Sequence, residues 1–343
     1  MPETVVVTGC AGFIGYHVAR RLLELGADVL GIDNMNAYYD VRLKEDRLAS
    51  LRAYDRFEFE RASVDDLPAL DRTFRRSAVS VVVHLAAQAG IRYSVENPHA
   101  FVQSNVVGFM NVLECCRQAG VGHLLYASSS SVYGANEKQP FSPHDGVGHP
   151  VSIYAATKRA NELMAHAYSH LYGLPTTGLR LFTVYGPWGR PDMAVFKFTR
   201  SILAGEPISI YNEGRMKRDF TYIDDVAEAI VRLVRKRPEP NVEWSGAAPH
   251  PDPATSYAPF RIYNVGARRP VPLLDVVSLL EEKLGVAANK RFMPMQDGDV
   301  AETYADVGDL RRDIGYEPAT PIEEGIAKFV EWYKEYYGAI GGG

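Results

Sequence analysis

The chain has 343 residues, 46% of them hydrophobic and 23% charged, which is the composition of an ordinary globular protein. Its formal net charge of −5 argues against nucleic acid or an anionic membrane as a partner, because no net positive field attracts phosphates. The cysteines, Cys10, Cys115 and Cys116, suggest no disulfide framework and no Cys/His spacing is typical of a metal site, so we expect a cytoplasmic protein without a metal.

The first element expected along the chain is a buried strand, TVVVTG, which is β-branched and ends at Gly9. An amphipathic helix, YHVARRLLELG, and a second strand, DVLGID, follow it and complete a βαβ unit. The N-terminus lacks the basic region of a signal peptide. No apolar run in the chain approaches the roughly 20 residues of a membrane span, so we expect no membrane partner.

The glycines between this strand and this helix, Gly9, Gly12 and Gly15, predict a dinucleotide site. Glycines let the backbone turn tightly and approach a pyrophosphate, and the helix N-terminus offers unpaired N–H groups to the anion. Asp33 ends the second strand, 18 residues after Gly15. A carboxylate there accepts the ribose hydroxyls and repels a 2′-phosphate, so the sequence favours NAD over NADP. The alternative is a tight turn that binds no ligand.

Strands and helices continue to alternate through the first half. FEFERASV and AVSVVVHLAA predict strands, HAFVQSNVVGFMNVLECCRQAG predicts a helix, and HLLYASSSSVYG predicts a strand that opens into a polar loop. This alternation predicts an α/β fold with a Rossmann-type, doubly wound parallel sheet. Because such sheets bind ligands at the carboxyl ends of their strands, we expect the chemistry at residues 86–88 and 128–131.

A tyrosine and a lysine begin the next predicted helix, SIYAATKRANELMAHAYSHLYG. Tyr154 and Lys158 are four residues apart and share one helical face. A free tyrosine, with a pKa near 10, is a poor base at neutral pH, but a nearby ammonium and an oxidised nicotinamide favour the phenolate. An isolated pair of this kind is usually a surface feature. Downstream of a dinucleotide site, it predicts that Tyr154 is a general base, with a serine hydroxyl sharing the proton path.

The second half departs from the alternation. TTGLRLFTVYG predicts a further strand of the sheet, and RIYNVG a later one. Between them, Arg215, Lys217 and Arg218 suit a diphosphate, although a solvated basic turn is the alternative. RKRPEPNVEWSGAAPHPDPATSYAPF predicts a long surface loop, and LLDVVSLLEEKLG and PIEEGIAKFVEWYKEYYG predict amphipathic helices.

Over nearly its whole length the chain resembles the extended short-chain dehydrogenase/reductase family of nucleotide-sugar epimerases and dehydratases. The motifs that carry the resemblance are TGCAGFIG, HLAAQAGIR, SSSSVYG, YAATK, TVYGPWGRPDMA and RDFTYIDD. Within the family, DNMNAYYDVRLKEDRL, QAGIRYSVENP and TVYGPWGRPDMAVFKF are most similar to the UDP-glucuronate 4-epimerases.

The resemblance implies an NAD-binding domain over residues 1–186, to which elements return from about 219–235 and 260–266. It implies a smaller C-terminal substrate-binding lobe, mostly within 187–338 and interleaved with the first domain. A homodimer, formed through helices that flank the active site, is the family expectation.

By resemblance, Tyr154 is the base, Lys158 holds the nicotinamide ribose, and Ser129 supplies the catalytic hydroxyl, because it lies four residues before the tyrosine of the V-Y-G motif. Asn105 matches a structural or cofactor-supporting asparagine. Ser63 stands where relatives usually have an aspartate that contacts the adenine.

The expected site residues fall into two sets. The positions expected to contact NAD are Gly9, Gly12, Phe13, Ile14, Gly15, Asp33, Asn34, Val64, Asp65, Leu85, Ala86, Ala87, Asn105, Tyr154 and Lys158. The positions expected to contact a UDP-sugar are Arg92, Ser129, Ser130, Thr183, Arg190, Arg218 and Asp299.

A uronic acid poses a particular problem for this chemistry. Oxidation at carbon 4 gives a β-keto acid, which loses carbon dioxide easily when its carboxylate stands perpendicular to the carbonyl plane. An epimerase must therefore hold the carboxylate in an unreactive orientation. By motif match, Thr183 and Arg190 are the candidates for this role, and Arg92 is a third. For each arginine, a surface ion pair is the alternative.

These features predict NAD-dependent 4-epimerisation of UDP-glucuronate to UDP-galacturonate through a transient 4-keto sugar, without net redox change. The alternatives are a UDP-glucose 4-epimerase, which differs in whether cations face carbon 6, and a UDP-glucuronate decarboxylase. Decarboxylases of this family usually carry an acid or a distinct serine at the position of Thr183. A non-enzymatic NAD-sensing protein agrees less well with the retained Tyr154 and Lys158.

Overall fold

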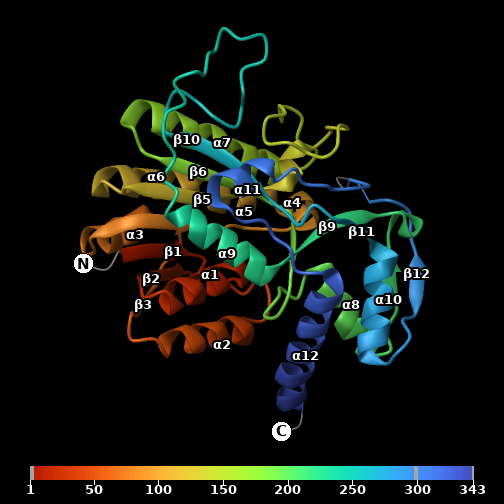
Figure 1. Ribbon diagram of the computed structural model, residues 1–343. Coiled ribbons are helices and arrows are strands. Elements are labelled where there is room, and N and C mark those ends of the chain that lie inside the picture. Colours follow the sequence, from red (N-terminus) through yellow and green to blue (C-terminus); the bar gives the residue numbers. More distant parts are fainter. Residues whose placement is uncertain (1–3, 297–299, 342–343) are drawn as a thin grey trace.

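The computed structural model describes residues 4–296 and 300–341 of the chain (Figure 1). Asp299, one of the predicted substrate contacts, lies outside the described residues. The main layer is a seven-stranded sheet in which every neighbouring pair is parallel. In spatial order its strands are β10 (Phe260–Val265), β6 (Thr176–Leu181), β5 (His123–Ser129), β4 (Val79–His84), β1 (Thr4–Thr8), β2 (Asp28–Asp33) and β3 (Phe57–Arg61).

Helices cover both faces of this sheet. Helices α1 (Phe13–Glu24), α2 (Val41–Arg52) and α9 (Ile223–Val234) pack in one core with Val5 and Val7 of β1. Helices α3 (Leu67–Arg75), α6 (Gly108–Ala119) and α7 (Ile153–Tyr172) pack in a second core with Val6, which points to the opposite face. The predicted doubly wound α/β sheet is therefore confirmed. Because helices cover both faces of the sheet, its strands are apolar at nearly every position.

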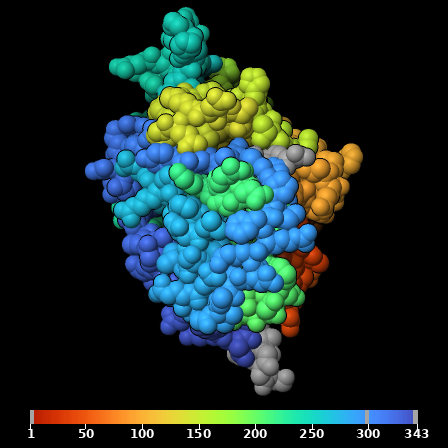
Figure 2. All heavy atoms as spheres, turned by 90° about the vertical axis from the view of Figure 1, so that its right-hand side faces the viewer, coloured from red at the N-terminus to blue at the C-terminus, as the bar shows by residue number. Residues whose placement is uncertain are grey.

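A smaller lobe lies beside the large sheet, on the right of Figure 1. It contains two small sheets, with the strand orders β11 (Pro270–Pro272), β9 (Lys217–Tyr222), β7 (Thr183–Tyr185) and β12 (Lys290–Phe292), β8 (Ile208–Ile210). Its helices are α8 (Ala194–Leu203), α10 (Leu273–Leu284) and α12 (Ile322–Gly341). Figure 2 shows α10 and β12, in blue, lying against the green segment that contains α8 and β8.

Shorter helical segments connect these layers. They are α4 (Ile91–Glu96), α5 (Pro98–Phe101), a π-helical turn η1 (Val102–Val107), two 3₁₀ turns η2 (Ser130–Tyr133) and η3 (Asn212–Gly214), and α11 (Gly308–Ile314). The segment 236–259 contains no helix or strand and projects from the body in both views, as the predicted surface loop should (Figures 1 and 2).

One predicted strand is wrong in its extent. TTGLRLFTVYG was expected to run as one strand of the large sheet, but the chain leaves that sheet after β6 and continues as β7 of the three-stranded sheet. The reason is pairing with β9, in which Thr183 is opposite Phe220 and Tyr185 is opposite Tyr222. The ring of Tyr185 also packs edge-on against Phe220. The break carries Thr183 out of the large sheet and into the wall between the two parts of the molecule.

Candidate active site

A cavity of about 990 Å³ lies where the carboxyl ends of the large sheet meet the smaller lobe. This is the position at which parallel α/β sheets bind ligands, and the volume is typical of a ligand pocket. Nearly all of the predicted site residues that the structure describes line it; only Asp65 and Asn105 do not. The sequence thus located the cavity, while the contacts of each residue with a ligand stay predictions.

The turn between β1 and α1 requires glycine at positions where the backbone approaches itself closely. Gly9 has φ +74°, and a Cβ on it would lie 2.8 Å from the Ala86 nitrogen. A Cβ on Gly15 would lie 2.0 Å from the carbonyl oxygen of Gly9. No side chain caps α1 at Gly12 and its first turn carries no acid, so no protein carboxylate competes for its N–H groups. This turn fits a pyrophosphate.

Asp33 is buried at the end of β2, where its carboxylate accepts the N–H groups of Ala11 at 3.2 Å and Met35 at 2.8 Å. Ser63, at the position where relatives have an aspartate, donates a hydrogen bond to Asp65 and accepts one from Asn34 Nδ2 at 3.2 Å. The Ser63 hydroxyl, followed by Gln103, lowers the pKa of Asp65. Asp65 is therefore held by protein groups, whereas Asp33 and Asn34 line the cavity.

Asn105 lies behind the cavity wall, in the π-helical turn η1. Its side-chain oxygen accepts the Gln88 N–H at 2.8 Å, and its Nδ2 donates to the Gln88 carbonyl at 3.0 Å and to Thr157 Oγ1 at 3.1 Å. These bonds fasten the loop after β4 to α7. The sequence predicted one continuous helix here; the π-turn is the local irregularity that aims Asn105 inward, and such turns are frequent at functional sites.

Tyr154 and Lys158 lie on the first turns of α7, which Ser152 caps by accepting the Ala155 N–H at 3.1 Å. Lys158 is buried, its Nζ donates to the Ala127 carbonyl at 2.9 Å, and burial lowers its pKa to about 8. Burial raises the pKa of Tyr154, and hydrogen bonding with Ser129 and the charge of Arg190 act in the opposite direction. Burial outweighs these two effects, so the protonated phenol of Tyr154 is favoured in the protein alone.

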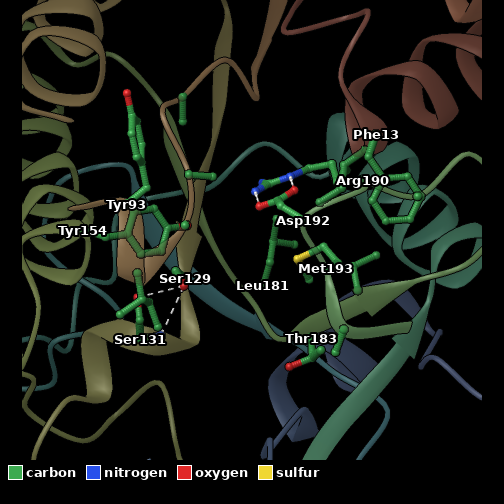
Figure 3. Close-up of a pocket in the computed structure, with 18 of the residues that line it drawn as sticks. Phe13, Tyr93, Ser129, Ser131, Tyr154, Leu181, Thr183, Arg190, Asp192 and Met193 are labelled. Carbon is green, nitrogen blue, oxygen red and sulfur yellow. Dashed lines mark hydrogen bonds and ion pairs between the residues drawn. The ribbon is translucent and has the colours of Figure 1, made fainter. Parts of the chain in front are cut away.

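Ser129 ends β5, and its Oγ accepts the Ser131 N–H at 3.2 Å and the Ser131 hydroxyl at 2.9 Å. Figure 3 shows Ser129 and Tyr154 on one side of the cavity, facing Arg190, Asp192 and Met193 across it. Its neighbour Ser130 also lines the cavity. A hydroxyl in this position is able to pass a proton to or from the tyrosine.

Arg190 forms a two-pronged ion pair with Asp192 on the same loop (Figure 3). Nε donates to Oδ1 at 2.9 Å and Nη2 donates to Oδ2 at 2.5 Å. Although burial works against the charged form of Arg190, Asp192 raises the pKa of the arginine. The Tyr38 hydroxyl also donates to Asp192, at 3.5 Å. The sequence predicted the arginine but not its internal partner.

Several further cations line the cavity. Arg92 lies over the ring of Tyr211 at 4.6 Å, and Arg218 donates to the carbonyls of Lys217 and Ala301 at 2.9 and 3.1 Å. Lys197 and Arg200 of α8 also line the cavity, and burial, followed by the charge of Arg92, lowers the pKa of Lys197. Such a group of cations suits a diphosphate.

Sequence reasoning missed Lys197, Arg200 and Tyr211. The two cations are three residues apart in the sequence, and on α8 this spacing places them on one helical face. That spacing was the available signal. Over the described ranges no group of acidic, histidine and cysteine residues is arranged to hold a metal ion, and none of the helices in those ranges is long and apolar enough to cross a membrane.

The comparisons with known proteins agree with this geometry. Residues 5–244 match the profile of the NAD dependent epimerase/dehydratase family. The chain belongs to this family. The family's cofactor is NAD, and the glycine turn and Asp33 fit it.

Similar proteins cover almost the whole chain. Protein CapI of Staphylococcus aureus is 56% identical over 97% of this chain and 99% of its own length. A probable UDP-glucuronate 4-epimerase of Rhizobium meliloti is 50% identical over 97% of both chains. The crystal structure of a UDP-glucuronic acid 4-epimerase from Bacillus cereus, in complex with UDP-glucuronic acid and NAD, is 29% identical with a TM-score of 0.84, and the match covers 98% of this chain and 100% of that one.

Proposed function

We propose that this member of the family is a UDP-glucuronate 4-epimerase that interconverts UDP-glucuronate and UDP-galacturonate without net redox change. The observation that carries the proposal is the largely buried guanidinium of Arg190, which lines the same cavity as Tyr154 and whose charge acts on the tyrosine hydroxyl. A cation there suits a sugar that bears a carboxylate at carbon 6. The names of the similar Rhizobium meliloti and Bacillus cereus proteins support the same substrate.

The cofactor end of the cavity is built by the glycine turn and Asp33, with Lys158 near the reacting end. When bound, NAD would supply the hydride acceptor and donor for carbon 4 of the sugar, with no net redox change. The pyrophosphate would lie at Gly12 and the N-terminus of α1, and the ribose hydroxyls at Asp33.

Tyr154 accepts the proton of the 4-hydroxyl, and Ser129 shares that proton. Since burial raises the pKa of Tyr154 in the protein alone, the phenolate needs a further positive charge beside it, and an oxidised nicotinamide has one. We infer that Tyr154 becomes a competent base only when the cofactor is in place. Lys158, already anchored to the Ala127 carbonyl, is positioned to donate to a ribose hydroxyl.

The carboxylate of the sugar must be restrained while carbon 4 is a ketone. Arg190, Thr183 and Arg92 all line the cavity. Of these, Arg190 is the best suited. Asp192 holds its guanidinium through Nε and Nη2, so the N–H groups of Nη1 and the second N–H of Nη2 keep a fixed direction in which to donate to a second carboxylate. Thr183 is able to donate one hydroxyl hydrogen bond.

We include a homodimer and a cytoplasmic location in the proposal. Apolar side chains are exposed on neighbouring helical segments beside the active site, with Leu163 and Leu171 on α7 and Val102 and Val107 on η1. A contiguous exposed apolar face is typical of an interface. Light scattering that gives the mass of a monomer would contradict this part of the proposal.

The test of the function is to incubate the purified protein with UDP-glucuronate, without added NAD, and to separate the products by chromatography and mass. An isomer of unchanged mass is expected. Loss of carbon dioxide would instead identify a decarboxylase. Conversion of UDP-glucose with no change of UDP-glucuronate would identify a neutral-sugar epimerase.

A further inference from the structure

Arg47 of α2 is a fully buried arginine that connects two loops far apart in the sequence. Its Nη1 donates to the carbonyl of Ala11 at 2.9 Å and to the Tyr39 hydroxyl at 2.7 Å. Its Nη2 donates to the carbonyls of Trp188, at 2.6 Å, and Gly189, at 3.4 Å. One side chain therefore joins the glycine turn of the cofactor site to the loop that carries the substrate-facing arginine.

This arginine is not placed as a structural ion pair would be. Within the described part of the chain its guanidinium contacts carbonyl and hydroxyl oxygens and forms no salt bridge, and its Nε has no hydrogen-bond partner. Burying a cation without a counter-charge is costly. An apolar side chain would fill the same space without that cost. The hydrogen bonds that Arg47 donates to the two loops are therefore the reason for an arginine at this position.

The two ends of the connection are both functional. The backbone of Ala11 lies between Asp33, which accepts its N–H, and Arg47, which donates to its carbonyl. At the other end, the bonded carbonyls of Trp188 and Gly189 immediately precede Arg190. A displacement of the peptide beside the ribose-binding carboxylate is therefore carried, through one rigid guanidinium, to the neighbour of Arg190.

The substrate-facing loop, residues 186–192, needs such support. Trp188 has φ +61°, an unfavourable value for a bulky residue, and such strain persists only where the surroundings enforce it. Those surroundings include a second polar anchor, because His17 Nε2 of α1 lies 3.0 Å from the carbonyl of Pro187 and donates to it. The consecutive carbonyls of residues 187–189 are thus hydrogen-bonded to side chains of α1 and α2.

We propose that Arg47 is a positioning residue that couples occupancy of the NAD site to the position of the substrate-facing loop, residues 186–192. With the cofactor bound, the Ala11 peptide is fixed and the loop is held with Arg190 directed into the cavity. Without it, the loop loses one of its anchors. The proposal rests on the NAD site of the family and not on the identity of the sugar.

The test is hydrogen–deuterium exchange of peptides covering 186–193, measured on the full chain with NAD bound and after its removal, with no sugar nucleotide present. Coupling between two sites typically changes an equilibrium by about 5- to 150-fold, so NAD should slow exchange in this loop of the native protein by at least about fivefold. In Arg47→Met this NAD effect should fall to about onefold.

The matched control is Arg261→Met. Arg261 is also largely buried, but it pairs with Asp309 and Asp313, outside the cavity and the substrate-facing loop. This variant should lose thermal stability and keep the NAD effect on the loop. If Arg47→Met does not fold, Tyr39→Phe decides, because it removes only the hydroxyl at 2.7 Å from Nη1 and should weaken the NAD effect.

Two results would overturn the proposal. The first is that NAD does not slow hydrogen exchange of the loop in the native protein. The second is that NAD slows this exchange as much in folded Arg47→Met as in the native protein or, if Arg47→Met does not fold, as much in Tyr39→Phe. Neither depends on turnover of UDP-glucuronate. A protein that fails to epimerise this sugar but shows the Arg47-dependent NAD effect would refute the proposed function and leave the coupling supported.

Discussion

Replacing Arg190 with methionine is the perturbation that bears most directly on how the protein treats a uronic acid. Methionine fills similar space but removes the two-pronged donor that now holds Asp192 at 2.9 and 2.5 Å. A hydrogen bond to a charged group contributes about 1.5–3 kcal/mol. We therefore expect the KM for UDP-glucuronate to rise roughly 10- to 150-fold, at about 1.4 kcal/mol for each factor of ten.

Loss of the ion pair between Arg190 and Asp192 has a second effect, on substrate binding and on stability. In Arg190→Met the Asp192 carboxylate, with 24% of its side chain exposed, is left without its cation and repels the sugar carboxylate. Its desolvation should lower the free energy of unfolding by about 1–3 kcal/mol. Arg190→Met/Asp192→Asn removes both charges, so it should recover stability and part of the binding while UDP-glucuronate still binds more weakly than to the native protein.

Steady-state kinetics with UDP-glucuronate, together with binding of UDP alone, provide the assay. The affinity for UDP should not change, because it lacks the carboxylate. Mass analysis of the products should show a greater share of decarboxylated sugar, since the unrestrained β-keto acid rotates freely. An unchanged KM and an unchanged product distribution in Arg190→Met would refute the role given to this arginine.

Three further predictions concern the base, the cofactor turn and the pH dependence of stability. Tyr154→Phe should abolish turnover, with the melting temperature and bound NAD retained; near-normal activity would exclude Tyr154 as the base. Gly15→Ala places a Cβ 2.0 Å from the Gly9 carbonyl oxygen. An overpacking cost of about 1–3 kcal/mol should weaken NAD retention by about 5- to 150-fold, at about 1.4 kcal/mol for each factor of ten, as measured by the NAD released on denaturation. His144 bridges Asp252 and Asp309, and hydrogen bonds to these carboxylates raise its pKa from 6.5 to about 9. Because the protonated form of His144 is favoured in the folded state, its contribution to stability is fully present below about pH 6.5 and is lost as pH rises through about 9. Over that range the melting temperature of His144→Gln should therefore fall less than that of the native protein. Identical dependence of the two melting temperatures on pH would contradict the role given to His144.

The sequence was sufficient for the fold and the location of the cavity because both follow from local rules. The spacing of Gly9, Gly12 and Gly15 reflects a turn that no Cβ can enter, and Asp33 ends the neighbouring strand as periodicity predicts. Tyr154 and Lys158 share a helical face for the same local reason. These signals require only a few consecutive residues.

The parts that the sequence did not predict depend on pairing between distant segments. The break after β6 arises because Thr183–Tyr185 pairs with β9 rather than with the large sheet. Arg47 was indistinguishable from the other cations of the charged stretch DVRLKEDRL, since its acceptors, the Ala11 and Trp188 carbonyls, lie 36 and 141 residues away. The direction of the Lys158 ammonium likewise depends on the tertiary position of Ala127.

The measurement that tests the central claim most directly uses UDP-glucuronate deuterated at carbon 4, incubated with the purified protein and no added NAD. The account predicts UDP-galacturonate of unchanged mass that retains the deuterium at carbon 4, because the hydrogen removed from that carbon returns to it. Recovery of unchanged UDP-glucuronate, loss of carbon dioxide, or an isomer in which the deuterium has exchanged with solvent would contradict it.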